Sequence, residues 1–120
     1  IQDENVSQAM QIAQAVRECV TLIEEMTGRT INVQSLSYNR LMNHIRYMVA
    51  RTLSGERLKI SMNDYTSIKF PRSFETAKRI CRIIAENLRG DVDELEIGYL
   101  AIHIERVLYD ELDSKKQEDR

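Results

Sequence analysis

Residues 72–89, RSFETAKRICRIIAENLR, carry the clearest structural pattern in the chain. Apolar side chains recur every three or four residues, which places them on one face of an α-helix, with charged side chains on the opposite face. Gly90 follows directly and is expected to end the helix. The pattern predicts an amphipathic helix whose buried row consists of Phe74, Ala77, Cys81, Ile84 and Leu88.

Two further helices are expected before this segment. Residues 6–26 have the same periodicity, and Gly28 follows where a left-handed closing residue is favourable because glycine has no Cβ. Ser35 is a suitable N-cap for a second helix, which should stop at Gly55. Residues 61–70 hold at most a short helix. The predicted inward row of the first helix is Val6, Ala9, Ala13, Val16, Val20 and Ile23.

A last helix is expected near the end of the chain. Asp91, with Glu94 three positions later, resembles a capping box that would open a helix running to about Leu112. Residues 113–120 contain no apolar side chain and are expected to form a charged tail or linker. Gly98 costs roughly 1 kcal/mol relative to alanine inside a helix, so we expect either a close helix crossing there or a tolerated glycine.

These elements together define the fold class. The chain has one proline and four glycines in 120 residues, which is little of the turn punctuation that a sheet protein needs. The short connections favour antiparallel neighbours, because each amphipathic helix must cover the apolar face of another. We therefore expect an all-α fold, a single compact bundle of four main helices plus one short helix, in one domain over residues 1–112.

Composition limits the classes of function. The 17 basic and 19 acidic residues give a formal charge of −2, whereas a nucleic-acid-binding module concentrates positive charge. Direct contact with nucleic acid is therefore not expected, and neither is a membrane span. Cys19 and Cys81 lie in apolar helical rows, where a thiol packs as a small hydrophobe, so no disulfide is expected. A reducing cytoplasmic location suits this cysteine usage.

The chain also lacks the sequence patterns of common catalytic sites. Its glycines are isolated at positions 28, 55, 90 and 98, so there is no phosphate-cradling loop for a nucleotide. No serine or cysteine nucleophile is paired in sequence with a recognisable base, and neither HxxxH nor HExxH occurs. We expect no catalytic residue, no metal ligand and no cofactor, and hence a protein that is not an enzyme.

The two histidines, His44 and His103, both lie in the middle of expected helices. Each shares a helix face with a tyrosine and an arginine at steps of three, four or seven residues. An arginine and a tyrosine within reach of an imidazole can hold an added phosphate by charge-assisted hydrogen bonds. The candidates for this supporting role are Tyr47 and Arg51 beside His44, and Tyr99 and Arg106 beside His103.

A histidine of ordinary pKa, about 6.5, is mostly neutral near pH 7 and can accept a phosphoryl group from a donor protein. Residue types alone favour the other interpretation, in which each histidine is a half-buried helix residue bonded to a carboxylate or carbonyl. Tyr47 and Tyr99 could likewise be ordinary aromatics at the edge of the core. Spacing alone does not decide between these interpretations.

Two segments of the sequence resemble a known family. Residues 94–106, ELEIGYLAIHIER, and residues 41–51, LMNHIRYMVAR, look like the two signature segments of the PTS regulation domain (PRD) of BglG/SacY-like antiterminators of sugar operons. The resemblance extends over nearly the whole chain. The YLAIHIER form is more similar to the second PRD of such proteins than to the first.

The resemblance implies a function that the residues alone do not. Such domains form helical bundles, usually as tandem pairs in homodimers, attached to an RNA-binding or DNA-binding effector domain that is missing here. By motif position, His44 and His103 would receive phosphate from the phosphocarrier HPr or from a sugar-specific enzyme II component. Phosphorylation would shift dimerisation, and RNA would be bound only by the effector domain.

One residue departs from the family pattern. Asn43 stands where many members carry aspartate immediately before the first histidine. The substitution removes a negative charge beside His44 and is expected to alter its pKa and its preference for a donor.

Three alternatives to the antiterminator hypothesis stay open. The chain could be a metal-binding helical-bundle enzyme that uses both histidines together with Glu96. It could be a PRD from a DNA-binding transcriptional activator. It could also be a purely structural dimerisation module with idle histidines.

Overall fold

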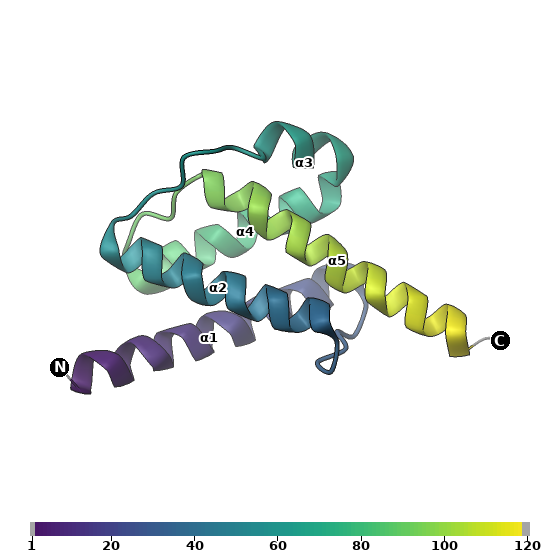
Figure 1. The fold of residues 1–120 in the computed structure, drawn as a ribbon, viewed down its shortest axis with the longest axis horizontal. Coiled ribbons are helices and arrows are strands. Elements are labelled where there is room, and N and C mark those ends of the chain that lie inside the picture. Colours follow the sequence, from purple (N-terminus) through teal and green to yellow (C-terminus); the bar gives the residue numbers. More distant parts are fainter. Residues whose placement is uncertain (1, 119–120) are drawn as a thin grey trace.

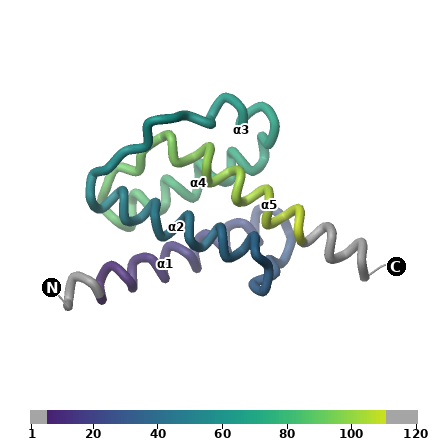
Figure 2. Tube along the Cα trace, in the orientation of Figure 1, coloured from purple at the N-terminus to yellow at the C-terminus, as the bar shows by residue number. Residues whose placement is uncertain are grey.

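The computed structural model describes residues 2–118, and the side chains of residues 6–110 (Figures 1 and 2). No strand occurs in this described part, which confirms the all-α prediction of four main helices and a short one. Figure 1 shows α1 and α2 running in opposite directions, and so do α4 and α5. The helices are α1 (Gln2–Thr27), α2 (Leu36–Ser54), α3 (Asn63–Lys69), α4 (Pro71–Leu88) and α5 (Leu95–Glu118).

The ends of α1 and α2 follow the expected chemistry. The Ser35 hydroxyl caps α2 by accepting a hydrogen bond from the backbone N–H of Tyr38, at 3.0 Å. Gly28 and Gly55, directly after α1 and α2, have φ values of 69° and 78°. This left-handed conformation favours glycine, because a Cβ would crowd the backbone there.

The connection between α4 and α5 differs from the prediction. Arg89, not Gly90, takes the left-handed conformation that closes α4, with φ of 50°. The expected capping box at Asp91 is wrong, since α5 begins at Leu95 and the Asp93 carboxylate accepts from the Leu95 N–H at 3.1 Å. Asp91 instead forms an exposed ion pair with the guanidinium of Arg57 at 3.0 Å.

The two terminal helices are longer than expected. Helix α1 begins at Gln2, and α5 continues to Glu118, beyond the predicted end near Leu112. Lysine, glutamine and glutamate are good helix formers, so a stretch without apolar residues can still prolong a helix. The use of residues 113–120 as a linker stays a prediction.

Helix α5 is the central element, because it packs against α2, α3 and α4. The predicted row of α4 is buried at Ala77, Cys81 and Ile84 and partly buried at Phe74 and Leu88. The predicted row of α1 is wrong over its first half, because Val6 is 58% exposed and both Ala9 and Ala13 are exposed. The buried residues of α1 are Ala15, Cys19 and Ile23.

Both cysteines are free, and burial raises the pKa of the Cys81 thiol to about 12. Among the described residues, no helix combines the length and apolarity that crossing a membrane requires.

Gly98 confirms the expected close crossing. The Asn63 side chain at the start of α3 accepts from the Gly98 N–H at 2.9 Å and donates to the Glu94 carbonyl at 3.1 Å. A Cβ at position 98 would lie 2.9 Å from the Asn63 nitrogen and 2.9 Å from the Met62 carbonyl carbon. Only glycine allows this approach without displacing backbone, so α3 is held against the first turn of α5.

Candidate functional site

The two histidines meet where α2 and α5 pack together. The ring centroids of His44 and His103 are 4.7 Å apart, and the ring planes are tilted by 32°. Each histidine is followed along its helix by a fully buried isoleucine, Ile45 in α2 and Ile104 in α5. Burial of these neighbours brings the helices together and leaves both imidazoles half-buried at the edge of the contact.

One nitrogen of each ring is enclosed by the packing. Nε2 of His44 and Nδ1 of His103 are buried and have no hydrogen-bond partner within the described part of the chain. Neither nitrogen therefore has the carboxylate or carbonyl partner that one interpretation of the sequence suggested. The closest ionisable ring to each histidine is the other histidine.

The surroundings hold both imidazoles in the neutral form. Burial, with the adjacent His103 and the Arg51 charge, lowers the pKa of His44 to about 3. The pKa of His103 is lowered by burial and then by the guanidinium groups of Arg106 and Arg40. A neutral imidazole keeps a lone pair on one nitrogen, which is the form that attacks phosphorus.

Arg51 forms an ion pair with Glu96, a residue that the sequence suggested only as a possible metal ligand. Its Nε lies 2.7 Å from Oε2 of Glu96, and a terminal nitrogen lies 2.8 Å from Oε1, so the ion pair is bidentate. The Glu96 side chain is 1% exposed and that of Arg51 is 20% exposed. Arg51 lies on the helix face of His44 but directs two donors to Glu96. Glu96 is thus paired with a cation. Among the side chains that the structure describes, those of residues 6–110, no group of three or more metal-ligating residues is present.

The two tyrosines occupy different surroundings. The Tyr99 hydroxyl donates to the carbonyl of Ile60, at 2.9 Å, and so ties α5 to the segment that leads into α3. Tyr47 is 63% exposed on α2. It borders a surface depression together with Ala50 and Arg51.

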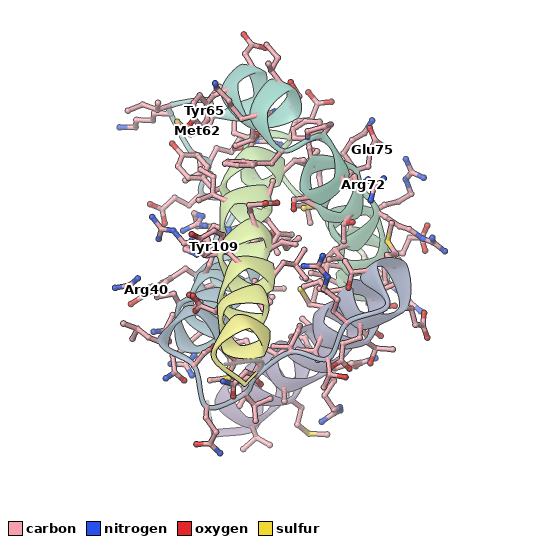
Figure 3. All side chains as sticks on the ribbon, turned by 90° about the vertical axis from the view of Figure 1, so that its right-hand side faces the viewer. Arg40, Met62, Tyr65, Arg72, Glu75 and Tyr109 are labelled. Carbon is pink, nitrogen blue, oxygen red and sulfur yellow. The ribbon has the colours of Figure 1, made fainter. Side chains whose placement is uncertain are left out.

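Two exposed arginines gather beside His103. Arg106 was expected there, whereas Arg40 lies four residues before His44 on α2, yet its charge acts on His103. Both line one surface groove between α2, α3 and α5, together with the aromatic residues Tyr65, Phe70 and Tyr109 and the acidic residues Glu105 and Asp110. Figure 3 shows Arg40 and Tyr65 on one side of α5, with Arg72 and Glu75 of α4 on the opposite side. The convergence of Arg40 with Arg106 depends on how α2 packs on α5, which no local pattern reveals.

The PRD domain family model matches residues 8–107, which include both histidines and both packed helices. The chain belongs to the PRD family. This confirms the resemblance drawn from residues 41–51 and 94–106. Membership identifies a regulatory domain under control of the phosphotransferase system, not an enzyme.

Several curated proteins are similar to the chain. Protein GlcT of Staphylococcus epidermidis is 35% identical over 95 residues, covering 78% of the chain and 34% of that protein. The PtsGHI operon antiterminator of Bacillus subtilis is 28% identical over 108 residues, with 85% and 37% covered. Transcription antiterminator LicT of Bacillus subtilis is 26% identical over 110 residues, with 88% and 39% covered. The chain thus spans well under half the length of each of these relatives.

Proposed function

We propose that the chain is the phosphorylation-controlled regulatory domain of a bacterial transcription antiterminator of a sugar operon. The carrying observation is the contact of His44 with His103, at 4.7 Å between ring centroids, in a chain that belongs to the PRD family. Two of the similar proteins are named as antiterminators, which favours that class of effector. The proposal places the chain in the cytoplasm and assigns it to the second PRD of its protein, on the form of residues 99–106.

Phosphate would come from HPr or from a sugar-specific enzyme II component. The lone pair of a neutral imidazole attacks the phosphorus of the donor, and the domain needs no nucleotide or metal for this step. Arg106, with Arg40 beside it, is the first candidate to neutralise the added charge on His103. Arg51 would serve His44 only by loosening its bond to Glu96. Tyr47 and Tyr99 would border the phosphorylated pair.

The added charge would act on assembly. A dianion at the contact of α2 with α5 repels neighbouring acidic groups and attracts arginines, which changes how two copies of the domain pack. The resulting shift in homodimer formation would control an attached RNA-binding domain. The regulatory domain would not bind RNA itself, in keeping with its net charge of −2.

Reconstituted phosphotransfer tests the acceptor role. The domain is incubated with phosphoenolpyruvate, enzyme I and HPr, with or without enzyme II, and acid-labile phosphate is measured. We expect label on the wild type and none on the His44→Ala, His103→Ala double variant. Arg46→Ala, a change at an exposed residue of the same helix, is the matched control and should keep the label. An unlabelled wild type, or full label on the double variant, would reject the proposal.

Sedimentation tests the effect on assembly. His44→Asp and His103→Asp place a permanent negative charge at each position. We expect the monomer–dimer equilibrium of these variants to differ from that of the wild type, whereas His→Gln variants stay close to it. Equal association constants for all of them would instead favour a structural module with idle histidines.

A further inference from the structure

The two adjacent rings do not present the same nitrogen to their surroundings. In His44 the enclosed atom is Nε2, the nitrogen far from the backbone, whereas in His103 it is Nδ1, the nitrogen close to the backbone. The opposite atoms, Nδ1 of His44 and Nε2 of His103, are not enclosed in this way. The packing of α2 against α5 therefore distinguishes the two nitrogens of each ring, and does so in opposite senses.

Attack on phosphorus needs open space along the lone pair. The lone pair of an imidazole nitrogen lies in the ring plane and must point at the phosphorus, with the leaving group on the far side. A buried nitrogen cannot meet a phosphorus atom carried by another molecule. Burial therefore excludes one nitrogen of each ring as the acceptor and leaves the other.

We propose that phosphorylation of this domain is confined to Nε2 of His103 and Nδ1 of His44. The inference rests on the proposed function, because it assumes that these two histidines are the acceptors. In a free histidine Nε2 is the less hindered nitrogen, since it is farther from the backbone. The fold thus keeps that preference at His103 and reverses it at His44.

Transfer of the phosphoryl group follows the same course at either ring. The acceptor lone pair forms the new N–P bond while the N–P bond of the donor breaks, and that electron pair stays on the donor ring. The hydrogen of the acceptor stays on its enclosed nitrogen. A donor ring protonated at its other nitrogen thereby becomes neutral, and the acceptor ring gains the positive charge.

The arginines support the assignment at His103. Arg40 and Arg106 are both exposed, and both are close enough to His103 for their charges to lower its pKa, so a phosphate on the less enclosed nitrogen of His103 would have two guanidinium groups nearby. A phosphate on Nδ1 of His103 would instead have to enter the packed interior, away from these exposed cations. Charge and access therefore favour the same nitrogen.

Chemical phosphorylation with potassium phosphoramidate tests the inference without a protein donor. The imidazole lone pair attacks phosphorus, and the N–P bond of the reagent breaks as ammonia leaves with the electron pair. Long-range ¹H–¹⁵N spectra then identify the phosphorylated nitrogen of each ring. In the folded domain we expect an excess of about tenfold or more of Nε2 over Nδ1 at His103, and of Nδ1 over Nε2 at His44.

Matched samples make the result specific. The same chain in urea should give mainly Nε2 at both histidines, because no packing then encloses a nitrogen. His44→Phe keeps a ring against His103 and should preserve Nε2 there, whereas His44→Ala uncovers Nδ1 and should lower the selectivity. Folded wild type that reacts like the urea sample, or that fails to react at a histidine reactive in urea, overturns the inference. Predicted isomers with phosphoramidate but no transfer from HPr or enzyme II would reject the proposed function alone.

Discussion

His44 and His103 are the same residue type in contact with each other, yet their surroundings differ in available positive charge. The cation that acts on His44 is Arg51, which is already bound through two hydrogen bonds to a buried carboxylate. His103 has Arg40 and Arg106, both exposed. The comparison teaches that the arginine beside His44 is committed to holding the fold together, whereas the two arginines beside His103 are exposed to an incoming dianion.

The largest effect should come from breaking the Arg51–Glu96 ion pair beside His44. Arg51→Met leaves the Glu96 carboxylate buried without a cation, and we expect it to lower the free energy of unfolding by about 3 kcal/mol. Arg106→Met, at an exposed site, is the control and should cost less than about 0.5 kcal/mol. Urea unfolding measures both. Equal losses for the two variants would show that the Arg51–Glu96 pair does not hold the fold.

The second effect is a loss of folding stability at acidic pH. The pKa of His44 is about 3 in the folded domain and about 6.5 when unfolded, so the unfolded chain binds the proton more tightly. This stabilising contribution is complete above about pH 6.5 and is lost as the pH falls toward 3. One such histidine contributes a slope of up to about 1.4 kcal/mol per pH unit.

Urea unfolding between pH 7.5 and pH 4 measures this slope. His44→Phe should remove more of it than His103→Phe, because burial lowers the pKa of His44 so strongly and the phenyl ring does not titrate. Parallel stability curves for wild type and His44→Phe would contradict the neutral, buried state of His44.

The smallest effect should come from the exposed arginines beside His103. Arg40→Gln and Arg106→Gln each remove one exposed cation beside His103, and we expect each to slow phosphate transfer to that residue by up to about fivefold. Transfer to His44 should change less. Initial rates at low ionic strength, with Arg46→Gln as the matched control, measure the difference. A loss of transfer rate confined to His44 would show that Arg40 and Arg106 support His44 and not His103.

Much of the fold could be predicted because its signals are local. The row of α4, the Ser35 cap and the left-handed glycines after α1 and α2 each depend on residues a few positions apart. Even the crossing at Gly98 could be expected, since a glycine in a helix interior is costly unless something lies close to it. The opening of α5 could not be placed correctly, because Asp91 and Asp93 both offer capping carboxylates and only tertiary packing selects Asp93.

The site could be predicted only in part. Periodicity placed both histidines on helix faces, but their contact depends on how α2 and α5 pack. The Arg51–Glu96 bond joins residues 45 positions apart, and the sequence had suggested Arg51 as a phosphate-supporting residue beside His44 and Glu96 only as a possible metal ligand. Enclosure of one nitrogen per ring is a still finer property, because it depends on side-chain orientation at a tertiary contact.

NMR of the two imidazole rings tests the contact between His44 and His103 most directly. We expect nuclear Overhauser contacts between ring protons of His44 and His103, and a His44 ring that stays neutral down to about pH 4. Rings without mutual contacts, each titrating near pH 6.5 as free histidine does, would contradict the account.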